Sequence, residues 1–270
     1  IVKDYMLNIV IINGGRGAST IIPSLLELDN CSITSIVNAY DDGKSTGEIR
    51  RFFSMLGPSD IRKVQELFLP FSNESTAYKD LFSFRYPDNS LHDEVISELN
   101  FFVEKKTNKI CNIKLNDEIV LSSLRECIKY FLDALKLIEK SRQITFEFSD
   151  CSIMNCIYAG AFLKNHRNIE KTSDFFKQLF KLRGSVIPNC IENRHLVAQR
   201  ENGEVLKCEA DIVELRSNVK INRIYLLDNP LRKKDLQDFS QDQSKAFLQL
   251  HDSFVETSQS SLSAIRNANI

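Results

Sequence analysis

The stretch ITSIVNAYDDGKSTGEIRRFFSMLGPSDIR, residues 33–62, decides the fold of this chain. It begins as a strand of small and β-branched residues and breaks at the turn Asp41-Asp42-Gly43. A basic helical segment follows Ser45-Thr46-Gly47, and the turn Gly57-Pro58-Ser59 introduces a further helix. Carboxylates, hydroxyls, glycines and arginines therefore gather at one end of one strand. This combination is typical of an anion site with room for a metal.

A second apolar run lies nearer the N-terminus. Residues 7–13, LNIVIIN, suit a strand covered on both faces, as in a parallel sheet. Gly14-Gly15-Arg16-Gly17 follows at once, and a helix is expected after it. Strand, glycine-rich turn, helix and strand form a βαβ unit. We therefore predict that Ile9–Asn13 and Ile33–Asn38 are adjacent parallel strands, with both turns at the same edge of the sheet.

The glycine-rich turn is a candidate phosphate site. Free N–H groups at a helix N-terminus point outward, and glycine lets an anion approach them. The pattern is G-G-x-G rather than G-x-G-x-x-G, and no acid closes the second strand at the ribose-binding distance. These two departures disfavour NAD.

The rest of the chain predicts two attachments to an α/β body. Apolar residues recur at helical spacing over 91–144, which predicts a helical insertion that packs, forms a lid or mediates a homodimer. Short strands and the hairpin signal Asn202-Gly203 predict a small β element over 185–228. We expect one domain over 1–270, with a Rossmann-like parallel sheet and helices on both of its faces.

Composition excludes several classes of function. The formal net charge of -1 argues against nonspecific binding to nucleic acid or to an anionic membrane. No apolar run approaches a membrane span, and no secretory signal opens the chain. The 7 cysteines are scattered, so we expect reduced thiols in a cytoplasmic protein. The chain begins with Ile1 and stops at Ile270 where a strand is expected, so we interpret it as a fragment that lacks a C-terminal part.

The charged residues near the two turns need partners. Asp41 and Asp42 repel each other unless a cation or donors lie between them. Mg²⁺ held by one or two carboxylates and phosphate oxygens is a common solution. Arg50 and Arg62 can each hold phosphate bidentately. Asn155 lies on an apolar helix and must find partners in the protein or in a ligand. The alternative, that the carboxylates only terminate a turn, is disfavoured by the neighbouring hydroxyls, arginines and glycines.

Several collinear segments resemble the 2-phospho-L-lactate transferase (CofD-like) superfamily. They are Gly14-Gly15-x-Gly17, Val37-x-Ala39-x-Asp41-Asp42-Gly43-x-Ser45-x-Gly47-x-Ile49-Arg50, Gly57-Pro58-x-Asp60-Ile61-Arg62, Ser152-Ile153-Met154-Asn155, Arg183-Gly184-x-Val186-Ile187-Pro188, and Asn202-Gly203-Glu204 with Glu209, which resembles a D-G-x-x-x-x-G-E hairpin. The chain is most similar to the gluconeogenesis-factor branch, whose pattern is D-D-G-G-S-S-G-x-L-R and P-G-D-I-R. It departs from that pattern at Lys44, Thr46, Ser59 and Met154.

The resemblance implies a Rossmann-like protein that binds a nucleoside-diphosphate-linked small molecule. In the transferase branch, it implies transfer of a phosphate-linked group from a guanylyl-linked donor with Mg²⁺, and Asp41 and Asp42 are then the candidate catalytic and metal-binding residues. In the gluconeogenesis-factor branch, it implies a non-catalytic UDP-sugar-binding regulator of carbon metabolism and cell-wall homeostasis. We lead with the transferase-like function and keep the regulator as the alternative. The candidate ligand- and phosphate-binding residues are Gly14, Gly15, Gly17, Gly43, Ser45, Thr46, Gly47, Arg50, Asp60, Arg62 and Asn155.

Overall fold

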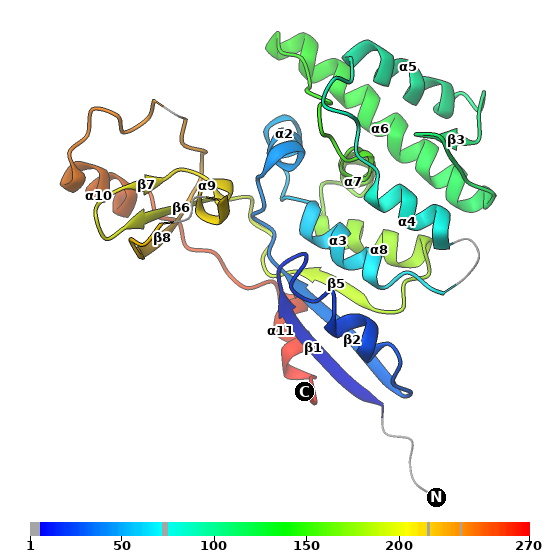
Figure 1. Ribbon diagram of the computed structural model, residues 1–270, viewed down its shortest axis with the longest axis horizontal. Helices are drawn as coiled ribbons and strands as arrows, with labels where there is room; N and C mark the ends of the chain where they lie inside the picture. Colours follow the sequence, from blue (N-terminus) through cyan, green and yellow to red (C-terminus); the bar gives the residue numbers. More distant parts are fainter. Residues whose placement is uncertain (1–5, 72–74, 215–216, 233) are drawn as a thin grey trace, which may run out of the picture.

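A three-stranded parallel sheet organises the larger part of the molecule (Figure 1). The computed structural model describes residues 6–71, 75–214, 217–232 and 234–270. The strands are β1 (Leu7–Asn13), β2 (Cys31–Val37) and β5 (Ser185–Pro188), in the order β1-β2-β5. Because all three are parallel, the loops that follow them lie at the same edge of the sheet. We call residues 7–188 and 259–270 the body.

The register of the sheet confirms one prediction and corrects another. β1 and β2 pair along their whole length, from Leu7 opposite Cys31 to Asn13 opposite Val37. The predicted parallel pair is therefore confirmed, and both turns follow its carboxyl edge. The prediction that 185–188 belongs to the small β element is wrong, because this strand pairs in parallel with β2. A four-residue strand carries no local signal of its partner, so only the tertiary fold assigns it.

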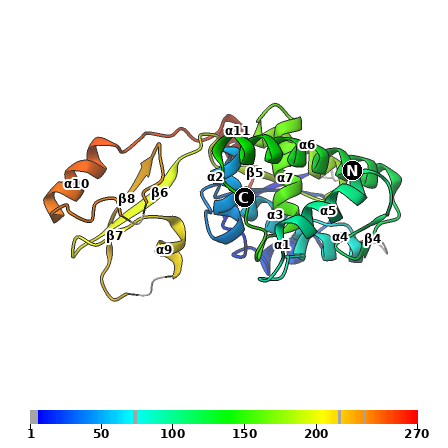
Figure 2. The same cartoon turned by 90° about the horizontal axis from the view of Figure 1, so that it is seen from above.

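Helices cover both faces of this sheet, as predicted (Figure 2). In the body they include α1 (Ile21–Leu25), α2 (Lys44–Phe53), α3 (Ser59–Leu67), α4 (Ser75–Ser83), α7 (Ile153–Lys164), α8 (Ile169–Leu179) and α11 (Gln259–Arg266). α3 and α8 pack on β5, and α11 packs on the same strand from the opposite face. After α11, the amide of Asn269 donates to the Asn8 carbonyl (2.8 Å) and the amide of Val10 donates to the Ile270 carbonyl (3.0 Å). The last residues therefore lie along the free edge of β1.

The stretch 91–144 is mainly helical, which confirms the prediction made from its apolar periodicity. It contains α5 (His92–Val103), α6 (Glu118–Arg142) and a hairpin of β3 (Lys109–Ile110) and β4 (Ile113–Lys114). α6 packs on α5 and α7, and Figure 1 shows it on the far side of α7 from the sheet. The insertion therefore packs on the body through α6, while its roles as a lid or in a homodimer stay predictions. No helix among the described residues is both long and apolar enough to cross a bilayer.

A second unit, residues 195–250, stands beside the body (Figure 1). It contains β6 (His195–Arg200), β7 (Val205–Leu206), α9 (Glu209–Glu214), β8 (Ile221–Leu227) and α10 (Gln241–Leu250). The strands form an antiparallel sheet in the order β7-β6-β8. A separate hydrophobic cluster of Val197, Tyr225, Leu227 and Leu248 holds it together. We call these residues the small β unit, which replaces the predicted element over 185–228.

Candidate functional site

The glycine turn after β1 meets the first turn of α3. The amide of Gly15 donates to the Asp60 carboxylate. A Cβ atom at Gly15 would collide with that carboxylate and with the Lys63 side chain, so a larger residue here would displace one or both of these side chains. Gly17 has no such restriction, since its nearest neighbour would be the Gly14 carbonyl at 3.9 Å. An internal carboxylate thus occupies the N–H group that the sequence predicts for a phosphate.

Asp41 joins this cluster from the loop after β2. Its Oδ1 atom accepts from the Gly43 amide (3.1 Å), while its Oδ2 atom has looser contacts with Thr46 Oγ1 (3.5 Å) and Lys63 Nζ (3.8 Å). Lys63 Nζ also lies 3.2 Å from Asp60 Oδ1. Lys63 therefore lies between two of the predicted site carboxylates. Sequence analysis missed it, although its position one helical turn after Asp60 is a usable signal.

Asp42 faces the small β unit instead. Its Oδ1 atom accepts the Ala210 amide at 3.3 Å, and the Glu209 amide also donates to this carboxylate. Burial raises the pKa of Asp42, whereas the charge of Arg50 and these two amides lower it. The two neighbouring carboxylates thus find separate donors in the protein. A cation between them is not needed to offset their repulsion.

Glu209 adds a fourth carboxylate to the site. Burial, together with the charges of Asp41, Asp42 and Asp60, raises its pKa to about 7, although the charge of Lys63 lowers it. Near neutral pH this group is partly protonated and can give or take a proton. The sequence singles out Glu209 only as part of the Asn202-Gly203 hairpin motif. Its position in the site depends on a helix that lies more than 140 residues along the chain from the predicted stretch, so the motif does not place it there. A bound diphosphate here needs Lys63, backbone N–H groups or a cation to offset the negative charge.

Arg50 is buried and its donors are largely used within the protein. It donates to the Tyr40 carbonyl (2.9 Å), to Asn193 Oδ1 (3.0 Å) and to the Arg194 carbonyl. Only its Nε atom lacks a hydrogen-bond partner. Burial and the charge of Arg50 together lower the pKa of His195 to about 4, so this imidazole is neutral at pH 7. The structure thus gives Arg50 the task of fixing the loop after β2 to the segment that leads into β6.

The remaining predicted polar residues form a buried network beneath the loop. Asn155 Nδ2 donates to Ser45 Oγ (3.1 Å) and to Ser59 Oγ (3.4 Å), and its Oδ1 accepts from Arg62 Nε (3.1 Å). Ser59 Oγ also bonds Thr46 Oγ1, and a second Arg62 nitrogen donates to a backbone carbonyl. Asn155 and Arg62 are therefore satisfied by protein partners. The network ties α2, α3 and α7 together and supports the loop that carries Asp41.

The glycines after Asp42 shape the backbone of the loop. Gly43 is the N-cap residue of α2 in extended conformation. A Cβ atom at Gly47 would collide with the Asp42 carbonyl, which explains why the chain has glycine there. Gly14 lies against the same Asp60 carboxylate, and a Cβ atom added to Gly14 would be 3.8 Å from Asp60 Oδ2. All the predicted glycines thus line the loops at the carboxyl edge of the sheet.

The oxygen atoms of the site can be compared with the ligands that Mg²⁺ requires. In the part of the chain that the structure describes, no group of three or more His, Cys, Asp or Glu side chains is placed to hold a metal ion. Asp41 Oδ2, one of the predicted metal-ligand atoms, makes only the loose contacts with Thr46 Oγ1 and Lys63 Nζ given above. One carboxylate oxygen with phosphate oxygens and water is a set that Mg²⁺ accepts. The residues therefore fit a cation brought by a phosphate ligand, and do not fit one held by protein side chains alone.

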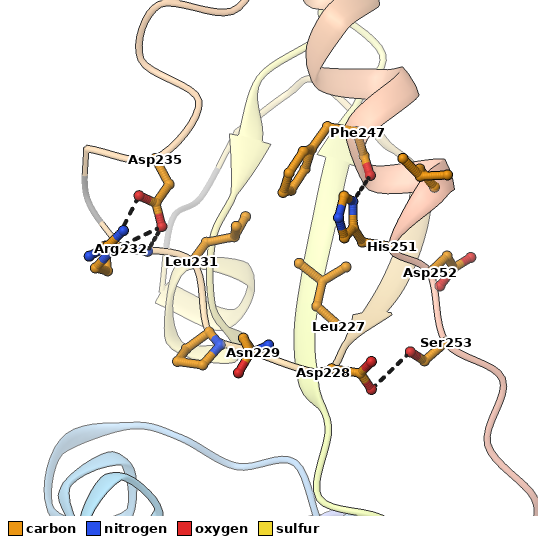
Figure 3. A pocket seen from close by; sticks show the side chains of 12 residues that line it. Leu227, Asp228, Asn229, Leu231, Arg232, Asp235, Phe247, His251, Asp252 and Ser253 are labelled. Atoms are coloured by element: carbon orange, nitrogen blue, oxygen red, sulfur yellow. Dashed lines mark hydrogen bonds and ion pairs between the residues drawn. The ribbon is translucent and has the colours of Figure 1, made fainter.

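A separate cavity of about 550 Å³ lies in the small β unit (Figure 3). The apolar side chains of Leu227, Leu231 and Phe247 line it, and His251 stacks on Phe247 with ring centroids 4.1 Å apart. None of the predicted site residues lines it. It lies beyond the carboxyl end of β8 and is distinct from the site at the sheet edge.

Comparison with known proteins gives one family. The family model described as 2-phospho-L-lactate transferase CofD matches residues 9–242. The gluconeogenesis factor of Listeria monocytogenes is 25% identical over 225 residues, which are 83% of this chain and 50% of that protein. A putative gluconeogenesis factor of Aquifex aeolicus is also 25% identical, over 82% of this chain and 50% of its own length. The chain thus spans about half the length of these curated relatives.

The fold also has a counterpart among solved structures. A UPF0052-family protein of Bacillus halodurans has a TM-score of 0.57 and 20% identity to this chain. The match covers 96% of this chain and 56% of that protein. This likeness supports the α/β fold described above.

Proposed function

Because the chain belongs to the CofD family, we propose that it binds a nucleoside-diphosphate-linked small molecule at the carboxyl edge of its parallel sheet. The observation that carries this proposal is the meeting of three segments at that edge: the Gly14–Gly17 turn, the 41–47 loop and the start of α3 with Lys63. Ligands bind in α/β sheets where the loops leave the carboxyl ends of the strands. Lys63 is the cation of this cluster and supplies the charge that a phosphate needs.

We propose that the bound molecule is a donor in a transfer reaction of the 2-phospho-L-lactate transferase type. In such a reaction an acceptor hydroxyl forms a new bond to phosphorus, and the bond between that phosphorus and the nucleotide breaks. The acceptor proton needs a base, for which Glu209 and Asp41 are the available carboxylates. Mg²⁺, held by Asp41 and phosphate oxygens, would offset the charge of the phosphates.

The alternative proposal is a non-catalytic regulator that binds a UDP-sugar. It is favoured by the name gluconeogenesis factor, which the similar Listeria protein carries. The two proposals share the site and differ in the fate of the ligand. A transferase consumes a bound donor when an acceptor is supplied, whereas a regulator leaves it intact; chromatography of the nucleotides after incubation separates the two.

The shared proposal is tested by titration calorimetry with UDP-glucose and with GDP, each with Mg²⁺ and with a chelator. We expect at least one nucleotide to bind, and Mg²⁺ to strengthen its binding. Lys63→Met should weaken that binding by roughly 1.5–3 kcal/mol, the typical contribution of a hydrogen bond to a charged group. Lys129→Met is the matched control, because Lys129 is exposed on α6 and pairs with Asp133 of the same helix at 3.5 Å. Binding of neither nucleotide, or equal affinity of Lys63→Met and wild type, would contradict the proposal.

A further inference from the structure

Two chain segments, 189–194 and 251–258, join the small β unit to the body (Figure 1). They are fastened together where they leave the sheet. The Ser258 amide donates to the Asn189 carbonyl (2.9 Å), and the Asn189 amide donates to the Val37 carbonyl (2.9 Å). The connection thus begins at the end of β2, directly beside the loop that carries Asp41 and Asp42.

The same two segments meet again at the end of β8. Arg194 pairs with Asp228 Oδ1 at 2.7 Å. Figure 3 shows the second contact of this oxygen, which accepts a hydrogen bond from Ser253 Oγ at 3.1 Å. Arg50 of the body holds the first segment through Asn193 and Arg194. One face of the small β unit is therefore fixed to the body through a buried arginine.

The second attachment is Asp42. Its carboxylate accepts the amides of Glu209 and Ala210, which are the first two residues of α9. Free N–H groups in the first turn of a helix need acceptors, and here a side chain of the body supplies one. α9 packs on β6 and β7, so a contact that holds α9 also holds the small β unit. The Asp42 carboxylate thus contacts the other unit at the residue that bears the fourth site carboxylate.

We propose that Asp42 is a positioning residue, which docks α9 onto the loop after β2 and thereby brings Glu209 into the site. The role of Asp42 is that of a hydrogen-bond acceptor, not of a metal ligand. The small β unit then contributes a side chain to a site that the body alone leaves incomplete. That Glu209 meets a ligand rests on the proposed function, whereas the docking of α9 does not.

The test is hydrogen exchange of the ligand-free protein, followed by mass spectrometry of peptides that cover residues 207–213. Asp42→Ala removes the acceptor, and we expect the α9 amides to exchange roughly fivefold faster, as for the loss of a typical helix cap. Asp42→Asn keeps an acceptor oxygen without the charge, so exchange should stay close to that of wild type. The matched control is Asp117→Ala on α6, where Asp117 accepts the amides of Ile119 and Val120 (2.9 and 3.1 Å). It should accelerate exchange at α6 and leave α9 unchanged.

Each outcome decides the proposal. Unchanged exchange of α9 in Asp42→Ala would overturn it, and so would an Asp42→Asn protein that behaves like Asp42→Ala, because charge would then matter more than the acceptor. Exchange of α7 in every sample, and of α6 in the two Asp42 variants, shows that the variants are folded. Since no nucleotide is present, the result is independent of whether UDP-glucose or GDP binds. With a nucleotide that binds, affinity should fall in Asp42→Ala and be rescued in Asp42→Asn.

Discussion

Neighbouring carboxylates in this protein differ because their surroundings differ. Asp41 and Asp42 are adjacent in sequence, yet Asp41 faces Lys63 and Thr46 of the body while Asp42 faces the first amides of α9. Both find donors, which offset the cost of removing a charge from water. Glu209 has less compensation, and its raised pKa follows. The acid–base properties of the site are therefore set by which carboxylate finds donors.

The Glu209 pKa predicts how stability depends on pH. Its folded value of about 7 lies above the ordinary value of 4.5, so folding favours the protonated form. Glu209 therefore contributes stability that is complete below the unfolded pKa and is lost as the pH rises through the folded pKa. The measurement is the free energy of unfolding in urea, for wild type and Glu209→Gln, between pH 4.5 and about 7. We expect the difference in favour of wild type to shrink as the pH rises. Glu201→Gln, at an exposed turn of the same unit, should give a curve parallel to wild type. A parallel curve for Glu209→Gln itself would show that the carboxyl is not buried among these charges.

At the scale of elements, local signals were sufficient for the first half of the sheet. The apolar run before Gly14 and the strand before Asp41 are consecutive along the chain, so a βαβ unit follows from their order. β5 was assigned to the wrong sheet, because its partner β2 lies about 150 residues earlier and four residues carry no register information. Likewise, the spacing of apolar residues along α6 predicts a helix, but it does not predict the helices on which α6 packs.

The site was predictable to the same extent. Sequence reasoning gathered Asp41, Asp60 and the glycines, because their loops follow adjacent strands. It could not decide whether buried polar groups meet a ligand or the protein, and the structure pairs Asn155 with Arg62. Glu209 belongs to a hairpin motif that the sequence shows, but its place in the site follows only from a tertiary contact, that of Asp42 with α9.

The contact of α6 with α7 depends on one glycine. A Cβ atom at Gly160 would collide with the Cys127 carbonyl and lie 3.2 Å from the Phe131 amide nitrogen. Both neighbours are helix backbone, which cannot yield as a flexible side chain can. We expect Gly160→Ala to lower the free energy of unfolding by at least about 2 kcal/mol, in the range of overpacked cores. Urea unfolding monitored by circular dichroism measures this, with Gly17→Ala as the control, because a Cβ atom there would only make an ordinary contact with the Gly14 carbonyl at 3.9 Å. Equal midpoints for the two variants would mean that the helices separate at little cost.

At the scale of the molecule, two hydrophobic clusters of unequal size hold the chain together. The body cluster includes aromatic residues that pack edge to face, such as Phe131, Phe146 and Phe148. The small β unit has a cluster of four buried residues, and Leu196 and Leu226 pack against the body cluster instead. Burial of apolar area scales with cluster size, so the small β unit is the less stable of the two. The site lies where they meet, and its completeness depends on the weaker unit.

The difference in size between the two hydrophobic clusters predicts which unit unfolds locally first. Leu248 of α10 is fully buried in the small cluster, and Leu248→Ala should cost about 2–5 kcal/mol, as for other buried leucines. Because the cluster is separate, we expect the loss to appear as faster hydrogen exchange in β6, β8 and α10, while α6 and α7 keep the rates of wild type. Leu124→Ala on α6 is the matched control, since Leu124 is equally buried in the body cluster and should accelerate exchange in α6 and α7. If Leu248→Ala accelerates exchange equally throughout the chain, the two units unfold together, and the docking of α9 by Asp42 and the bonds of Arg50 couple them more strongly than their separate cores indicate.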